Sequence, residues 1–367
     1  MTVSLPECPE DGKIAVLPAN FRALVFRRGG TREGRSLCRA TCGVTGQGRA
    51  LFVNTGLVNT GLVNTGLVNT GLVNTGFMNI GSMSTGSMNI GIIGLGLIGG
   101  SMALDLKQAG THRILGVSRQ QTTCEQAIAR GVVDEASTDL SLMAAADVVI
   151  LCTPLSAINA TVTQLIPHLA ADTILTDVGS VKAPVVDAIA PQWPNFIGGH
   201  PMAGTSESGL DAAQRHLFVD RAYVLTPIDS TPAAAVETVA DIARSLQAVV
   251  YQCSPQTHDQ AVAWISHLPV MVSASLIAAC LHEPDPVVLD MSKKFASSGF
   301  RDTSRVGGGN PELGLMMARY NSAQLLRSLH AYRDQLDQVI HTVEQEDWRS
   351  LHALLEQTHS ARPPFVE

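Results

Sequence analysis

The sequence has few aromatic residues, no CxxC cysteine pairs, no excess of positive charge and no long uninterrupted apolar run. A formal net charge of −7 repels phosphate polymers and anionic lipids, so we expect no nucleic-acid partner. No stretch approaches the roughly 18 uninterrupted apolar residues that a membrane helix needs, so we expect no membrane partner. The seven cysteines are scattered and odd in number, which predicts no disulfide framework, no metal site and a reducing, cytoplasmic location.

The composition is that of a folded protein with a sizeable core. Hydrophobic residues make up 45% of the 367 residues and charged residues 16%. A chain of this length predicts two or three domains rather than one small module.

Residues 1–87 differ from the rest of the chain. They carry eight basic and four acidic residues, so the acidity belongs to residues 88–367. From residue 53 the chain repeats LVNTG-like units with a period of five residues, from which we expect no stable core. Three interpretations stay open: a transit-like peptide, a functional disordered arm, and an upstream reading frame fused by a misplaced start. We expect the third, with translation starting at Met88, Met83 or Met78.

A glycine motif follows this extension. Residues 89–100 read NIGIIGLGLIGG, an apolar run followed by GxGxxG and then a helical pattern. In the dinucleotide-binding fingerprint, Gly94 would permit the tight turn, Gly96 the approach of the pyrophosphate, and Gly99 close packing of helix on strand. The predicted cofactor-binding residues of this motif are Gly94, Gly96, Leu97, Ile98 and Gly99.

The end of the next strand predicts which dinucleotide binds. An acidic residue about twenty residues beyond the glycines would bind the ribose hydroxyl of NAD. Here the chain has Ser118 and Arg119 instead. A hydroxyl and a guanidinium suit a 2′-phosphate, so we predict NADP as the cofactor. The alternative is an ordinary surface arginine.

Strand and helix patterns alternate as far as residue 252. They predict an α/β domain, a Rossmann-type doubly wound parallel sheet over residues 88–253. Residues 254–367 are almost wholly helical in pattern and form a second, all-helical domain. Ligands of such sheets bind beyond the carboxyl ends of the strands.

Four polar or loop residues follow predicted strands and are candidates for this site. They are Thr153, Pro154, Ser180 and His200. His200 suits a general base, because an imidazole can take the proton of a hydroxyl whose carbon loses hydride. Ser180 could orient that base or the substrate; the alternative is a cap for a helix over residues 181–190.

The helical part adds two candidate substrate-binding residues, His267 and Arg305. A guanidinium is the usual clamp for a carboxylate. Arg301, which has Asp302 beside it, is better explained by a structural ion pair.

The motifs GLGLIGGS, DVGSVK, GGHPMAGT, SHLP and FRDTSR, in this order, resemble the prephenate/arogenate dehydrogenase family of tyrosine biosynthesis. The resemblance covers about residues 88–355. It implies oxidative decarboxylation of a cyclohexadienyl acid, His200 as partner of the 4-hydroxyl, and Ser180 near the same oxygen. It also implies substrate contacts from His267 and Arg305 and a homodimer formed by the helical domain.

One position departs from many prephenate-using relatives. They read SHLPH, whereas this chain has Val270 after SHLP. The loss of a potential donor favours arogenate over prephenate, and similarity to cyanobacterial and plant-type enzymes points the same way. Two other classes stay open: an NADP-dependent β-hydroxyacid or ketopantoate-type reductase, and a non-catalytic NADPH sensor.

Overall fold

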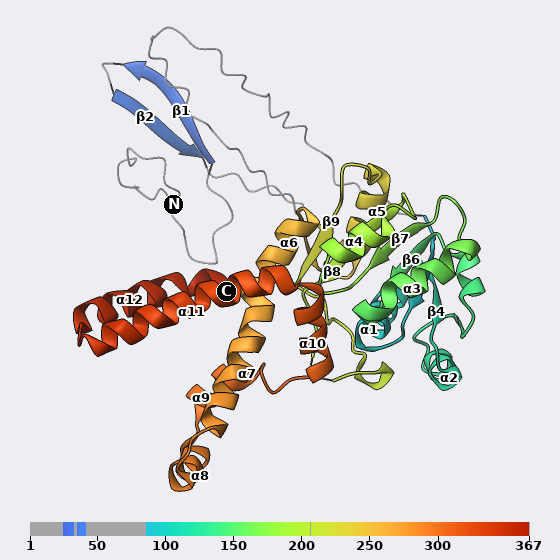
Figure 1. The fold of residues 1–367 in the computed structure, drawn as a ribbon. Coiled ribbons are helices and arrows are strands. Elements are labelled where there is room, and N and C mark those ends of the chain that lie inside the picture. The colour runs from blue at the N-terminus through green and yellow to red at the C-terminus, as the bar shows by residue number, and fades with distance from the viewer. Residues whose placement is uncertain (1–24, 33–34, 42–85, 206, 367) are drawn as a thin grey trace. The chain divides into compact units, whose positions relative to one another are not determined.

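A computed structural model describes residues 25–32, 35–41, 86–205 and 207–366 (Figure 1). The chain divides into two compact units, Met1–Asn79 and Ile80–Glu367. In the first unit, β1 (Val25–Arg32) pairs antiparallel with β2 (Arg35–Thr41). The pentapeptide repeat and its expected lack of a core lie outside the described residues.

The second unit is built on an eight-stranded sheet of order β10-β9-β8-β7-β6-β3-β4-β5. Its strands are β3 (Asn89–Ile93), β4 (Arg113–Val117), β5 (Glu135–Ser137), β6 (Val148–Leu151), β7 (Ile174–Asp177), β8 (Phe196–Pro201), β9 (Ala222–Thr226) and β10 (Val249–Gln252). All neighbouring strands are parallel except β8 and β9. The predicted doubly wound fold is confirmed, with one antiparallel pair that the sequence analysis did not foresee.

Helices cover both faces of this sheet. They are α1 (Leu97–Gln108), α2 (Gln121–Ala129), α3 (Leu155–Leu165), α4 (Ala183–Ile189) and α5 (Ala233–Ser245), with short 3₁₀ turns η1 (Leu140–Ala145), η2 (Ile166–His168) and η3 (Leu210–Ala212). Side chains of α1 and α5 pack on one face, and side chains of α3 and α4 pack on the other. The central strands are therefore buried on both sides, which explains their continuous Val and Ile runs.

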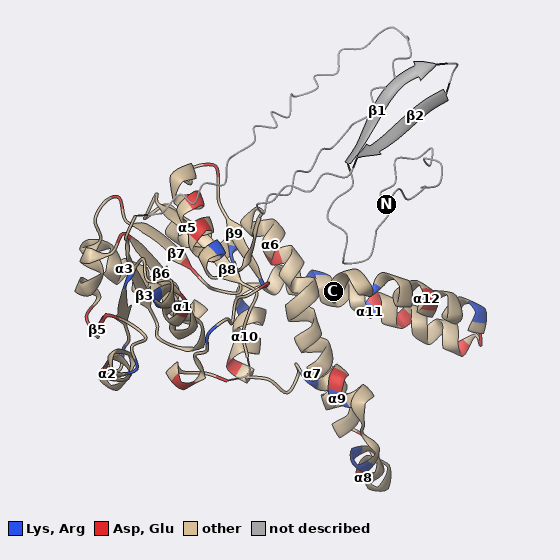
Figure 2. Ribbon diagram, turned by 180° about the vertical axis from the view of Figure 1, so that it is seen from behind, with Lys and Arg blue, Asp and Glu red and all other residues tan. Residues whose placement is uncertain are grey.

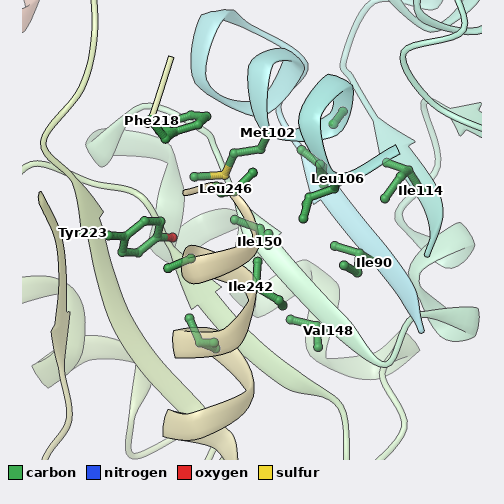
Figure 3. Packing of buried hydrophobic residues seen from close by; sticks show 14 of the residues in the cluster. Ile90, Met102, Leu106, Ile114, Val148, Ile150, Phe218, Tyr223, Ile242 and Leu246 are labelled. Atoms are coloured by element: carbon green, nitrogen blue, oxygen red, sulfur yellow. The ribbon is translucent and has the colours of Figure 1, made fainter. Parts of the chain in front are cut away.

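The close-up of the first core layer shows how helix and strand interlock (Figure 3). Met102 and Leu106 of α1 lie over Ile90 and Ile150 of the central strands, and all four side chains are fully buried. Their spacing of four residues on α1 is the pattern that predicted this helix. The packing fixes the start of α1 against the end of β3, where the glycine motif lies.

From residue 255 the described chain is entirely helical, as the sequence predicted. Its helices are α6 (Pro255–Val262), a π-helical turn η4 (Ala263–His267), α7 (Leu268–Leu281), α8 (Pro286–Phe295), α9 (Ser298–Ser304), α10 (Pro311–Tyr320), α11 (Ser322–Glu344), α12 (Trp348–Ala361) and the 3₁₀ turn η5 (Pro363–Phe365). Helix α6 contacts α4, so it connects this region to the sheet.

The run from α6 through α7 is apolar and poorly covered. Among the described residues, Pro255–Leu281 is the one helix long and apolar enough to cross a membrane, with a mean hydropathy of 1.7 and 17% of that window buried. Length and apolar composition are all that this criterion tests, and a helix covered by a second apolar surface meets it equally. Figure 2 shows charged residues on α11 and α12, whereas α7 carries none. An apolar surface is thus presented by this part of the chain.

We expect Gly307→Ala to destabilise the junction of α7 and α9. A Cβ at Gly307 would lie 2.3 Å from the backbone nitrogen of Ala274, and backbone atoms of a packed helix yield little. Overpacking of this kind costs roughly 1–3 kcal/mol. Gly308→Ala is the matched control, because its Cβ would meet only the Arg305 carbonyl at 3.9 Å. Thermal unfolding of the two variants measures the difference, and equal midpoints would contradict the prediction.

Candidate functional site

The glycine turn between β3 and α1 has the geometry of a dinucleotide-binding loop. Gly94 has φ = +102°, and a Cβ there would lie 2.5 Å from the Cys152 carbonyl oxygen. A Cβ on Gly99 would lie 2.1 Å from the Gly94 carbonyl oxygen, whereas one on Gly96 would meet no atom within 4 Å. The first and third glycines therefore serve packing, and the second leaves open space at the backbone for a phosphate group.

Helix α1 begins with Leu97 and Ile98, directly after this open position. The residue at its N-cap position is Gly96, so no side chain caps the first amide groups of the helix. The first amide groups of a helix have no partner within the helix, and the helix dipole favours an anion there. The residues present thus fit a dinucleotide pyrophosphate.

The end of β4 lies next to the glycine turn. The Gly94 amide donates to the Val117 carbonyl at 2.8 Å, which holds the following residues Ser118 and Arg119 beside the turn. Ser118 is partly buried and Arg119 is exposed. Both residues therefore lie at the edge where the ribose of a dinucleotide would be expected.

Thr153 and Pro154 follow β6 on the other side of the glycine turn. A Cβ on Gly94 would lie 3.1 Å from the Thr153 amide nitrogen. The Thr153 hydroxyl is buried without a hydrogen-bond partner among the described residues, and Pro154 caps α3. An unpartnered buried hydroxyl is costly, so this group is available to a bound ligand.

A buried ion pair joins the ends of β7 and β8. The Lys182 ammonium contacts the Asp177 carboxylate and donates to the Gly199 carbonyl at 2.7 Å, and Asp177 accepts from the Gly199 amide at 3.2 Å. Burial lowers the pKa of Lys182, and the charges of Asp177 and Asp259 oppose that shift. The pair fixes the backbone immediately before His200.

Ser180 lies between the two partners of this ion pair and is partly buried. Helix α4 begins at Ala183, and its cap residue Lys182 makes no side-chain cap bond. The interpretation of Ser180 as a plain helix cap is therefore wrong. Asp259 of α6 accepts the first amide groups of α4 instead.

His200 lies on β8 and contacts a second histidine. Its Nδ1 is 2.8 Å from Nε2 of His258 on α6, and the two rings meet edge to face with centroids 5.1 Å apart. Burial, and then the neighbouring His258, Lys182 and His267, hold the pKa of His200 well below its usual value. A neutral imidazole at this position can accept a proton.

Asp259 continues the chain of contacts from His258. Its Oδ1 is 2.8 Å from Nδ1 of His258 and accepts the Lys182 amide at 2.7 Å, and its Oδ2 accepts the Ala183 amide at 2.8 Å. His258 and Asp259 are 2% and 3% exposed. Three donors compensate the buried carboxylate.

His267 lies in the π-helical turn and is fully buried. The side-chain nitrogen of Asn321 donates to the Asp259 carbonyl at 2.8 Å and is 3.1 Å from Nδ1 of His267. Because this nitrogen is a donor, Nδ1 of His267 accepts and Nε2 carries the proton. That Nε2 has no partner among the described residues. Burial lowers the pKa of His267 to about 4, so the ring is a neutral donor.

Arg305 follows α9 and is exposed. No hydrogen bond or ion pair joins it to His200 or His267 within the described part of the chain. Its substrate-binding role stays a prediction. Arg301 pairs with Asp302 at 3.3 Å, in agreement with the structural interpretation of that arginine.

Sequence reasoning missed four residues of this network. They are Lys182, His258, Asp259 and Asn321. Lys182 stands in a quoted motif. His258 and Asp259 are adjacent and lie within the first helix of the second domain, which was a usable signal. Nothing in the local pattern of Asn321 indicates its contact with His267, because these residues are far apart in sequence.

Three features together define a dinucleotide-dependent dehydrogenase. They are the open glycine turn, the neutral histidine at the carboxyl ends of the strands, and the helical region packed against those strands. The family model described as the nucleotide-binding domain of prephenate dehydrogenase matches residues 102–252. The model described as its dimerization domain matches residues 254–357. Pentapeptide repeats, in eight copies, match residues 53–92, although the last of these residues form β3.

Known proteins agree with these family matches. A prephenate dehydrogenase of Bacillus subtilis is 34% identical over 261 residues, which is 69% of each chain. A crystal structure of Synechocystis arogenate dehydrogenase is 52% identical, with a TM-score of 0.71, covering 76% of this chain and all of that one. Prephenate dehydrogenase from A. aeolicus, in complex with hydroxyphenyl propionate and NAD+, is 26% identical with a TM-score of 0.71, covering 75% and 97% of the two chains.

This chain belongs to the prephenate/arogenate dehydrogenase family, as the motifs predicted. It is an NAD(P)-dependent oxidoreductase of tyrosine biosynthesis with a dimerization domain. Membership in this family replaces the reductase and sensor interpretations.

We expect the free energy of unfolding to decrease as the pH is lowered, in part because of His267. Its pKa is about 4 in the folded chain and about 6.5 when unfolded, so unfolding takes up a proton between these values. The stabilisation is present above pH 6.5 and is lost as the pH falls toward 4. One such proton corresponds to about 1.4 kcal/mol per pH unit.

The measurement is the free energy of unfolding by urea between pH 7 and 4. His267→Asn should show a shallower slope than the wild type, by about one proton. His352→Asn, at an exposed histidine, is the control and should keep the wild-type slope. Parallel curves for all three proteins would contradict the prediction.

Proposed function

We propose that this protein converts L-arogenate to L-tyrosine by oxidative decarboxylation, with NADP+ as electron acceptor. The observation that carries the proposal is the 52% identity to Synechocystis arogenate dehydrogenase over the full length of that chain. The runner-up is prephenate, which would yield 4-hydroxyphenylpyruvate. It is favoured by the 34% identity to a relative named prephenate dehydrogenase.

His200 performs the proton chemistry in this proposal. The partly buried, neutral imidazole takes the proton of the substrate 4-hydroxyl while that carbon is oxidised and the ring carboxylate leaves as carbon dioxide. When bound, the nicotinamide supplies the two-electron acceptor for this oxidation. Ser180, between the strand end and Lys182, orients the same oxygen.

His267 and Arg305 bind the substrate in this proposal. The Nε2–H of His267 is buried and unpartnered among the described residues, which suits an acceptor oxygen of the substrate. Arg305 is exposed and clamps a carboxylate as substrate enters. Hydroxyphenyl propionate in the A. aeolicus enzyme is a ligand of the same chemical kind, an aromatic ring with a carboxylate-bearing side chain.

The preference for arogenate rests on Val270. This residue is three positions beyond His267 in the first turn of α7, so the two share a helix face. A Cβ on Gly314 would lie 3.7 Å from Cγ1 of Val270, so the valine packs toward α10. A histidine here would offer a donor to the keto group of prephenate, and valine offers none.

NADP specificity rests on Ser118 and Arg119. An acidic residue at the end of β4 would repel a 2′-phosphate, whereas a hydroxyl and an exposed guanidinium attract it. The A. aeolicus structure contains NAD+, so the proposed NADP+ preference would distinguish this chain from that relative.

A cytoplasmic homodimer completes the proposal. Large apolar side chains on the C-terminal helices are exposed in the single chain, among them Leu281, Val287, Phe295 and Leu336. These helices belong to the region matched as a dimerization domain, so a second copy would cover such side chains. The dispersed cysteines support a reducing compartment.

The purified full-length chain should reduce NADP+ with arogenate faster than with prephenate. The measurement is absorbance of the reduced nicotinamide, with each substrate and each dinucleotide. Val270→His should move the ratio of kcat/KM toward prephenate by roughly 10-fold, the value of one hydrogen bond. Val270→Ala is the control that removes bulk without adding a donor. A wild-type preference for prephenate would discard the Val270 argument and keep the family.

Arg119→Ala should raise the KM for NADP+ by about 10-fold, because a charge-assisted bond contributes roughly 1.5–3 kcal/mol. The KM for NAD+ should change little. Arg130→Ala, at an exposed arginine after α2, is the control and should alter neither value. An unchanged KM for NADP+ in Arg119→Ala would refute the contact with the 2′-phosphate.

A further inference from the structure

We propose that His258 and Asp259 form a proton relay behind His200 and select its reactive tautomer. The proposal deepens the function given above, since it rests on His200 as the base. It concerns two positioning residues of α6 that do not themselves touch the reacting atoms. The contacts Asp259–His258–His200 form a continuous chain with two steps of 2.8 Å.

With Asp259 as a carboxylate and His258 neutral, the contacts fix one arrangement of protons in the resting enzyme. Asp259 accepts two backbone amides, so it is an ionised acceptor, and Nδ1 of His258 must donate to it. Neutral His258 then has a lone pair on Nε2, which accepts the Nδ1–H of His200. This arrangement leaves Nε2 of His200 without a proton, as a general base requires.

The relay also accommodates the proton that the reaction releases. Nε2 of His200 takes the hydroxyl proton, and the Nδ1 proton of His200 passes to Nε2 of His258. The net change is one proton gained by the histidine pair, with the positive charge on His258 next to the Asp259 carboxylate. Before the next turnover, the proton on Nε2 of His258 returns to Nδ1 of His200 and the proton on Nε2 of His200 leaves to solvent. This restores the resting tautomers, so the step balances without a further reactant.

Charged and titratable groups surround the pair on several elements. Lys182 faces it from the loop after β7, with Asp177 as the partner of that lysine. His267 faces it from η4, and Cys253 lies just before α6. Among the residues that the structure describes, only Asp259 brings a negative charge into direct contact with His258. A charge on His258 is therefore compensated at this one position.

Asp259 also has a structural role, which a test must distinguish from its role in the relay. It accepts the first amides of α4 and thereby attaches α6 to the sheet domain. His258 makes no such backbone contact through its side chain, so it is the better residue to change. A role in packing alone would alter stability or cofactor binding without moving the pH profile.

The test compares His258→Leu and His258→Gln in the full-length enzyme. Leucine removes both ring nitrogens; glutamine can accept the Nδ1–H of His200 through its amide oxygen but cannot carry a proton onward. Loss of general-base assistance costs about 10²–10⁴-fold. We expect at least about 10²-fold lower kcat for His258→Leu and an intermediate value for His258→Gln. Gln260→Leu, at an exposed position of α6, is the matched control and should keep the wild-type kcat.

The pH profile of kcat/KM is the readout that packing does not move. His258 is neutral at rest in this scheme, so its removal takes away no repelling charge, only the route by which the added proton reaches the Asp259 carboxylate. Leucine leaves the Nδ1–H of His200 without an acceptor and glutamine cannot pass that proton on, so the imidazolium of His200 is less stable and the acidic limb should shift to lower pH in both variants. The NADP+ dissociation constant and the unfolding midpoint should stay near those of the wild type.

Two results would overturn the relay. One is a His258→Leu enzyme with kcat within about 3-fold of wild type, well below the usual contribution of a base. The other is a loss of activity with an unshifted acidic limb. If the leucine variant does not fold, His258→Gln decides, and full activity with an unshifted limb in that variant overturns the proposal.

His200→Asn separates the relay from the proposed function. If this variant keeps activity, the assignment of His200 as base fails and the relay fails with it. If it loses activity while both His258 variants behave as wild type, the base stands and only the relay is refuted.

Discussion

The buried carboxylate of Asp259 is the interaction on which the site depends. It accepts the Lys182 and Ala183 amides at the start of α4 and the imidazole of His258 on its own helix. Its backbone carbonyl accepts from Asn321, which in turn contacts His267. One residue thus connects the sheet domain, α6 and α11. Because a buried carboxylate needs all its donors, these elements keep a fixed relative position.

The ion pair of Asp177 and Lys182 performs the corresponding task inside the sheet. Both side chains are inaccessible to solvent, and both bind the backbone of Gly199. A Cβ at Gly199 would lie 2.7 Å from the Asp177 carbonyl oxygen, so the small residue is required for this close approach. Removal of one charge would leave the other buried and unpaired, which costs about 3–5 kcal/mol. The pair therefore holds the strand that carries His200.

Local patterns were sufficient to predict most of the fold and the glycine turn. Apolar runs bounded by glycines located the central strands, and four-residue spacing located α1. Three-residue β5 has no such run, and antiparallel pairing of β8 and β9 follows from a connection without a crossover helix. His200 and Ser180 were found because they follow strands predicted from the sequence, although β8 extends to Pro201 and so includes His200. His258 and Asn321 act through contacts between distant segments, which no periodicity encodes.

Burial gives the two site histidines opposite chemical roles without giving either a charge. The pKa of each lies below its usual value, so both rings are neutral near pH 7. The two rings differ in the partner of Nδ1. In His200 that partner is Nε2 of His258, an acceptor, and in His267 it is the amide nitrogen of Asn321, a donor. One ring consequently presents a lone pair and the other an N–H. In the proposed reaction, a substrate hydroxyl that must lose a proton and an oxygen that must be held find complementary partners. His258 and Asn321, which set these two states, both belong to the helical domain rather than to the dinucleotide-binding sheet.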